Sequence, residues 1–132
     1  MDDLARSDFS SETHAQVFDA ITQVVELVAD EKIALATERL TALVAAFPKE
    51  GFAHAYLAWV LSLSGRYRDA IEHGKVAVQL SPRSERVSLL FFRVLWAADE
   101  RPQALDEMRR FVTLEDSEEY AQIVLALQQA GM

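Results

Sequence analysis

The side chains that most often carry out catalysis or hold metals are sparse in this chain. It has no cysteine, and its three histidines, His14, His54 and His73, lie far apart in the sequence. No two of them have the i, i+4 spacing that places two metal ligands on one face of a helix. Four glycines in 132 residues cannot supply a glycine-rich phosphate loop. We therefore predict no catalytic residues, no metal, no cofactor and no enzymatic activity.

The adjacent charged pairs are also predicted to be structural. The acidic pairs Asp30-Glu31, Asp99-Glu100 and Asp106-Glu107 are placed at turns or on outer helix faces, where solvation is the ordinary explanation. Arg109-Arg110 is placed near the end of a helix, where the helix dipole favours cations and no further role is required. Catalytic carboxylates need a pocket that shifts their pKa, and the pattern indicates none.

Composition limits the chain to a small set of protein classes. With 132 residues, 51% of them hydrophobic and 26% charged, it is long enough for one domain with its own core. Its net charge of −8 opposes binding to nucleic acid or to an anionic membrane. No apolar run approaches the roughly 18 residues that span a bilayer, and the start, MDDLARSDFSS, is unlike a signal peptide. These features predict a soluble, cytoplasmic protein.

Charge is unevenly distributed along the chain. Residues 1–50 hold ten acids against four bases, whereas residues 51–116 hold nine of each sign. A site for an acidic partner is therefore expected in the second of these segments.

A fixed period of 34 residues organises the elements that must position any functional residue. Ala36, Ala70 and Ala104 stand 34 residues apart, and Pro48 and Pro82 keep the same interval. A period of this size indicates a stacked array of one repeated unit.

The clearest unit, residues 51–84, has the pattern helix, turn, helix, stop. Its apolar residues recur at three- and four-residue spacing, which is typical of helices with one buried face. Gly65 falls where the first helix must end, because glycine adopts a left-handed conformation without steric penalty. Pro82 ends the second helix, and the stretch from Ser81 to Ser84 is interpreted as a helix stop and cap.

This unit resembles a tetratricopeptide repeat. The resemblance rests on seven residues at the positions where that family has Leu, Gly, Tyr, Ala, Ala, Leu and Pro, namely Leu57, Gly65, Tyr67, Ala70, Ala77, Leu80 and Pro82. Three positions depart from the pattern. His54 replaces Trp and is expected to pack in the core, Ala58 replaces Gly, and Gly74 replaces a large apolar residue and is expected to loosen its helix.

The resemblance implies an all-α fold, a right-handed α-solenoid of three helix pairs followed by a C-terminal capping helix, seven helices in all. The expected boundaries are an N-terminal arm or start of the first helix at 1–16, repeats at 17–50, 51–84 and 85–116, and a cap at 117–132. In the third repeat Asp99 replaces the turn glycine, and Pro102 is expected in the first turn of the next helix. Ser117, followed by Glu118 and Glu119, predicts the N-terminus of the capping helix, whose apolar stripe ends near Gly131.

In this family the first helix of each pair lines the concave surface. Carried over by position, that surface receives both tryptophans, whose rings, like that of tyrosine, are enriched at binding hot spots. Arg86 and Arg93 lie seven residues apart on the same helical face and are placed to bind a carboxylate. The predicted partner-binding residues are Phe52, Tyr56, Trp59, Arg86, Leu90, Arg93 and Trp96.

The apolar inner face could instead be covered by the protein itself. Either the chain's own N-terminal segment could fill it through Leu4 and Phe9, or a second copy could do so in a homodimer. An error in register would also move the predicted residues off the surface. The family's known carboxylate clamp for the tails of heat-shock chaperones is not expected, because its Lys and Asn positions are occupied by Ile21, Val25, Tyr56, Arg86 and Leu90.

The leading functional prediction is an adaptor or scaffold that binds a peptide or helix of a partner protein in its concave aromatic groove. One alternative is a dedicated chaperone of a secreted bacterial protein, since small acidic proteins with about three such repeats are similar to type III secretion chaperones. A self-associating structural module is the second alternative.

Overall fold

The computed structural model describes the backbone of residues 2–131 and the side chains of residues 12–131. Leu4 and Phe9 fall outside the described side chains. The described part of the chain is all-α, as predicted, and contains seven helices. They are α1 (Asp2–Ala29), α2 (Ile33–Ala46), α3 (Gly51–Leu63), α4 (Tyr67–Leu80), α5 (Glu85–Ala97), α6 (Arg101–Leu114) and α7 (Glu118–Gln129).

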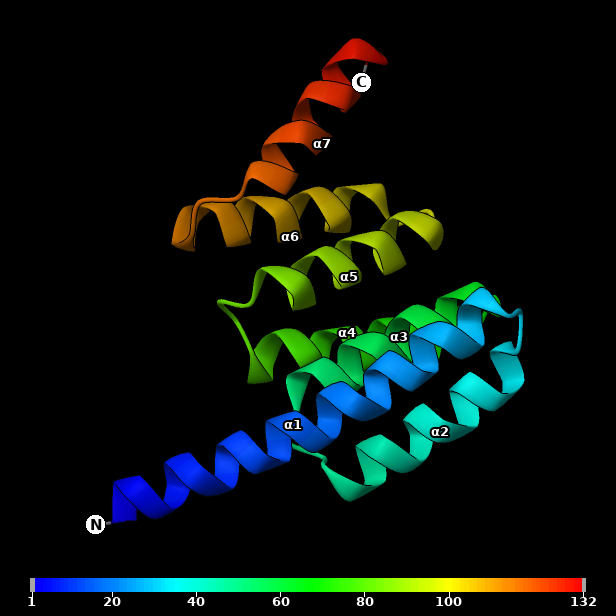
Figure 1. The fold of residues 1–132 in the computed structure, drawn as a ribbon. Helices are drawn as coiled ribbons and strands as arrows, with labels where there is room; N and C mark the ends of the chain where they lie inside the picture. Colours follow the sequence, from blue (N-terminus) through cyan, green and yellow to red (C-terminus); the bar gives the residue numbers. More distant parts are fainter. Residues whose placement is uncertain (1, 132) are drawn as a thin grey trace.

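The helices form three successive antiparallel pairs, α1 with α2, α3 with α4, and α5 with α6 (Figure 1). Neighbouring pairs stack side by side, because α3 packs against both α2 and α5, and α4 also packs against α5. Ala36, Ala70 and Ala104 are completely buried, one in the second helix of each pair. Small side chains at these positions allow the helices to approach closely, which accounts for the 34-residue interval.

The turn inside each pair has the same backbone conformation. Glu31, Gly65 and Asp99, each 34 residues from the next, have positive φ angles of 63°, 75° and 62°. In each turn the next amide donates to a carbonyl five residues earlier, as in the Lys32 to Leu27 bond of 2.8 Å. The left-handed position predicted at Gly65 is confirmed, and the two other turns adopt it without glycine.

The helix starts also follow the predicted signals. The Ser117 hydroxyl accepts a hydrogen bond from the Tyr120 amide at 3.1 Å and so caps α7. Ser84 caps α5 in the same way, and Pro102 lies in the first turn of α6. These side chains satisfy amides that have no partner inside the helix.

Gly74 does not loosen α4, contrary to the sequence prediction. The helix continues through it, and the residue is buried. A Cβ atom there would overlap the aromatic ring of Phe91 on α5. The family's large apolar residue is therefore replaced by glycine because Phe91 fills that space from the neighbouring repeat.

His54 packs in the core, as predicted, and there it contacts His73, which lies 19 positions later in the sequence. The His54 side chain is only 7% exposed, and its Nε2 lies 2.8 Å from the Pro48 carbonyl oxygen. Its Nδ1 lies 3.1 Å from Nδ1 of His73 on α4. If Nε2 of His54 donates to the carbonyl, its Nδ1 can accept the proton of His73, so both rings are hydrogen-bonded as neutral groups.

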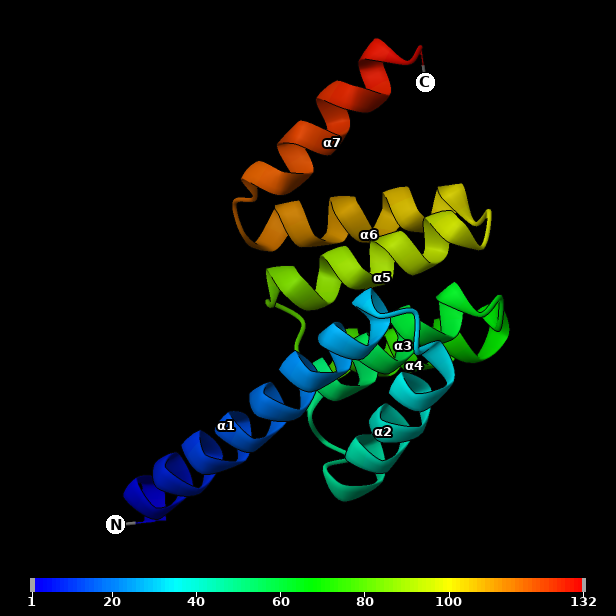
Figure 2. The ribbon, with the colours of Figure 1, turned by 45° about the vertical axis from the view of Figure 1, so that its right-hand side comes forward.

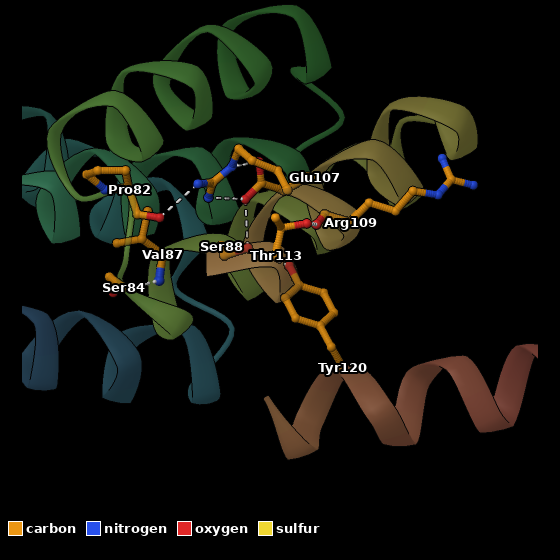
Figure 3. A network of polar contacts seen from close by, with 9 residues as sticks. Pro82, Ser84, Val87, Ser88, Glu107, Arg109, Thr113 and Tyr120 are labelled. Atoms are coloured by element: carbon orange, nitrogen blue, oxygen red, sulfur yellow. Dashed lines mark hydrogen bonds and ion pairs between the residues drawn. The ribbon is translucent and has the colours of Figure 1, made fainter. Parts of the chain in front are cut away.

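A buried polar network joins α5, α6 and α7 (Figure 3). Glu107 on α6 is 6% exposed, and its carboxylate accepts hydrogen bonds from Ser88 at 2.7 Å and from two nitrogens of Arg110. The Ser88 and Tyr120 hydroxyls are 2.6 Å apart, and Arg110 also donates to the Pro82 carbonyl at 2.8 Å. Burial raises the pKa of the Tyr120 phenol well above its usual range.

This network corrects two predictions about charged pairs. The sequence predicts Glu107 on a solvated outer face, but its side chain is buried. The sequence also predicts that Arg110 acts only on the helix dipole, but Arg110 is the ion-pair partner of Glu107. Within these helices the carboxylate needs Arg110 and Ser88 together, because a buried charge is costly unless it is paired and hydrogen-bonded.

α7 projects away from the stack rather than lying flat on it. In Figures 1 and 2 it leaves the end of α6 and diverges from the third pair toward its own C-terminus. Tyr120 is the one residue of α7 that is buried, and it contacts Phe92 and Phe111 edge-on or at a tilt. The cap is therefore attached mainly through its first turn.

Candidate interaction site

The inner surface holds two adjoining hollows lined by the first helices of the pairs. The central hollow, of about 360 Å³, lies between α3 and α5 with a contribution from α1 and α7, and is lined by Val25, Tyr56, Trp59, Glu85, Arg86, Leu89, Leu90, Arg93 and Glu119. The N-terminal hollow, of about 470 Å³, lies between α1 and α3 and is lined by Phe18, Ile21, Thr22, Val25, Glu26, Phe52, Tyr56 and Arg86. Val25, Tyr56 and Arg86 line both, so the two hollows adjoin, and we refer to the two together as the groove.

Five of the seven predicted partner-binding residues meet in the central hollow, namely Tyr56, Trp59, Arg86, Leu90 and Arg93. Phe52 lies in the N-terminal hollow, where its ring contacts that of Phe18 with centroids 5.4 Å apart. Trp96 lies in neither. It lines a separate C-terminal cleft between α5 and α7, formed by Phe92, Arg93, Trp96, Ala97, Ile123, Ala126 and Leu127.

Burial divides the residues of the groove into supports and accessible groups. Tyr56 and Leu90 are 8% and 6% exposed and belong to the hydrophobic core. Trp59 and Phe52 are half-buried, whereas Arg86 and Arg93 are exposed. An incoming partner would therefore reach mainly Trp59, Phe52 and the two arginines.

Tyr56 contacts two of the accessible groups of the groove, Arg86 and Trp59. Its hydroxyl accepts a hydrogen bond from Arg86 Nη1 at 3.0 Å, and its ring meets that of Trp59 edge-on with centroids 6.1 Å apart. One buried tyrosine thus positions both a guanidinium and an indole, which have donors to offer to a ligand.

The central hollow has charge of both signs. Glu85 and Glu119 line it together with Arg86 and Arg93. Sequence reasoning places the arginines there but misses Glu119, which comes from α7. Glu119 reaches the hollow because of the direction in which α7 leaves the stack, and the repeat pattern does not predict that direction.

Neither a metal site nor a spanning helix is found in the described residues. No group of three or more His, Asp or Glu side chains there could hold a metal ion. Within the same part of the chain, none of the helices combines the length and the apolar character needed to cross a bilayer.

Comparisons with known proteins identify the fold. No protein-family model matches the chain, and no curated protein sequence matches it. Solved structures do match. The first TPR of Spaghetti (RPAP3), bound to the HSP90 peptide SRMEEVD, has a TM-score of 0.70 at 16% identity and covers 86% of this chain and 93% of its own.

Two further matches are structures of MamA. A double mutant of MamA from RS-1 has a TM-score of 0.63 at 21% identity over 72% of this chain, and MamA 41-end from Desulfovibrio magneticus RS-1 has 0.64 at 22% over 74%. The aligned part spans 53% and 57% of those two chains. Together with the repeated turns and buried alanines, these similarities show that the chain has the tetratricopeptide-repeat fold, as its sequence predicted.

Proposed function

We propose that the protein is an adaptor or scaffold that holds a peptide or helix of a partner protein in the groove formed by the N-terminal and central hollows. The proposal depends on one observation above all. Trp59, Arg86 and Arg93, from two different repeats, meet at one hollow of about 360 Å³.

The accessible groups of the groove define what it would bind. A half-buried indole offers a large apolar surface, and rings of this kind are the usual anchors of interfaces. Arg86 and Arg93 would bind acids of the partner, whereas Glu85 and Glu119 favour a base near them. We therefore infer a partner segment with an apolar anchor flanked by charges of both signs.

The bound peptide of the Spaghetti structure supports peptide binding by this fold, but a tail of that kind is not the expected ligand. Of the five clamp positions considered in the sequence, Ile21, Tyr56 and Leu90 are buried apolar or aromatic residues here. Among these five positions only Arg86 carries a positive charge, so the family's clamp is not reproduced, and an acid of the partner would meet Arg86 and Arg93 instead.

Capture of partners from the native cell tests the groove. The wild-type protein and a Trp59→Ala/Arg93→Glu variant would be used as baits, and bound proteins would be identified by mass spectrometry. Because truncating an aromatic hot spot costs more than about 1 kcal/mol, and reversing a contacting charge adds to that, partner recovery should fall at least about tenfold.

A matched control separates this effect from general charge or folding effects. Tyr67 and Arg68 are exposed residues of α4 outside both hollows, so Tyr67→Ala/Arg68→Glu makes the same kinds of change elsewhere. This variant should retain the partner, and all three proteins should show equal helical circular dichroism. Equal recovery by all three baits would contradict the proposal.

A further inference from the structure

The C-terminal cleft is lined almost entirely by apolar side chains. It has a volume of about 350 Å³, and α5 contributes Phe92, Trp96 and Ala97 while α7 contributes Ile123, Ala126 and Leu127. It exists because α7 diverges from the third pair after Tyr120, so the two helices are in contact at one end and apart at the other (Figures 1 and 2).

A small molecule is a poor occupant for this cleft. Ligand sites of this size combine apolar walls with several polar groups that fix the orientation of the ligand. Arg93 is the one charged side chain among the seven lining residues, and it is shared with the central hollow, so the indole N–H of Trp96 is the one further side-chain donor. The cleft instead has the character of a groove that receives the apolar face of a helix.

Two arginines border the cleft. Arg93 is exposed and makes no ion pair with any described side chain. At the wide end, the Arg101 guanidinium lies over the Trp96 ring at 5.0 Å from its centroid, and its nearest acid, Asp99, is 3.8 Å away and largely exposed. The helix that fits here should therefore be apolar on one face and acidic at one end.

α7 itself meets both requirements. It begins with Glu118 and Glu119, contains no basic residue, and continues as an apolar segment whose Ile123 and Leu127 are only half-buried in the monomer. A surface that is complementary to one of its own elements is what a twofold-symmetric dimer needs, because the same patch must serve on both subunits.

We propose that the C-terminal cleft binds α7 of a second copy of this chain, so that two molecules exchange these helices across a twofold axis. If the two α7 helices run antiparallel, the acidic first turn of each lies at the wide end of the other's cleft, beside Arg101. Ile123 and Leu127 of both copies then pack together with Trp96. The cleft shares Arg93 with the central hollow, but its other lining residues are different, and this inference does not depend on the proposed function.

Oligomeric state measured by light scattering after gel filtration tests the proposal. The wild-type protein should be a dimer that dissociates on dilution, and Leu127→Asp should shift it to monomer by raising the dissociation constant at least about tenfold, as expected when a buried hot-spot side chain is lost. Leu125→Asp is the matched control. Leu125 lies on the same helix but is 48% exposed and does not line the cleft, so this variant should remain dimeric.

A charge exchange between exposed residues tests the orientation. Arg101→Glu should weaken the dimer, and Glu118→Lys/Glu119→Lys should weaken it by a similar factor. The triple variant that combines them restores opposite charges across the twofold axis and should recover most of the lost affinity.

Several results would overturn the proposal. A wild-type protein that stays monomeric at high concentration would do so, as would a dimer that survives Leu127→Asp. A dimer dissociated by Trp59→Ala but not by Leu127→Asp would place the contact in the inner groove instead. Failure of the triple variant to recover affinity would reject the antiparallel exchange.

Discussion

Among single residues, Glu107 has an environment unlike that of its sequence neighbour, because its side chain is buried. Asp106, one position earlier, is exposed and paired only with Arg109 on the surface. Removing the buried carboxylate leaves Arg110 and Ser88 without their main acceptor, and a hydrogen bond to a charged group is worth about 1.5–3 kcal/mol. Glu107→Ala should therefore lower the free energy of unfolding by about 1.5–3 kcal/mol.

Urea unfolding monitored by circular dichroism measures this difference. Asp106→Ala is the control and should change stability by no more than about 0.5 kcal/mol, as is usual for an exposed site. Similar losses in the two variants would mean that the network of Glu107 contributes no more than a surface ion pair.

His73 makes the stability depend on pH. Burial, reinforced by His54, lowers the pKa of His73 below its ordinary value of 6.5, although Asp69 and Glu72 act in the opposite direction. The unfolded chain therefore binds more protons than the folded one once the pH falls below about 6.5, so stability should decrease as the solution is acidified through that range.

Unfolding free energies between about pH 8 and about pH 5.5 would measure this slope, since the range brackets the ordinary histidine pKa. His73→Gln should make the slope shallower, because it removes the titrating group. His14→Gln should not reproduce that change, since the His14 side chain is about half exposed and lies on another helix. An unchanged slope in His73→Gln would show that other groups cause the pH dependence.

For the helices, the contact between α4 and α5 at Gly74 accounts for a departure from the repeat pattern. Alanine is the better helix former by about 1 kcal/mol, but its Cβ would overlap the Phe91 ring, and overpacking of a core costs about 1–3 kcal/mol. Gly74→Ala should therefore destabilise the protein despite its helix propensity. The loss should be smaller in a Phe91→Leu background, where the ring is absent.

Thermal unfolding of the four proteins in this cycle gives the coupling between the two sites. Additive effects would mean that Phe91 moves aside without cost, and the steric reason given for Gly74 would then be wrong.

The helices and turns were predictable from sequence because their causes are local. The 34-residue period, Gly65 and Ser117 act through backbone conformation and capping within a few residues. The contacts between repeats were not predictable in the same way. The sequence places Glu107 on a solvated face, because it does not show that Ser88 lies 2.7 Å away on another helix. It likewise predicts that Gly74 loosens α4, because it does not show that the Phe91 ring fills the space beside it.

The candidate site was also predictable only where its residues follow from the repeat pattern. Repeat positions placed Trp59, Arg86 and Arg93 on the inner surface, and the structure brings them to one hollow. They could not show that Trp96 is set apart, because its separation depends on the angle at which α7 leaves the stack. At that point α7 is held by one buried side chain, Tyr120, whose hydroxyl contacts Ser88 of α5.

At the scale of the whole molecule, packing is uneven from one end to the other. The middle of the stack is the most buried, since α3 has ten buried residues and α5 has seven, whereas α7 has one. Local opening requires the least free energy where few apolar contacts are broken. The stack should therefore unfold as a unit while α7 opens and closes independently of it.

Amide hydrogen exchange tests this difference and connects it to self-association. In dilute protein, the amides of residues 123–129 should exchange through local opening, and those in the centre of α3 and α5 only near global unfolding. If α7 of each copy is bound in the cleft of the other, raising the protein concentration should slow amide hydrogen exchange in residues 123–129, because a helix held by a second molecule opens less often. Leu127→Asp should abolish that concentration dependence and leave α3 and α5 as they were. Equal protection of α7 and α3 in dilute protein would show that Tyr120 anchors the helix far more firmly than its burial indicates.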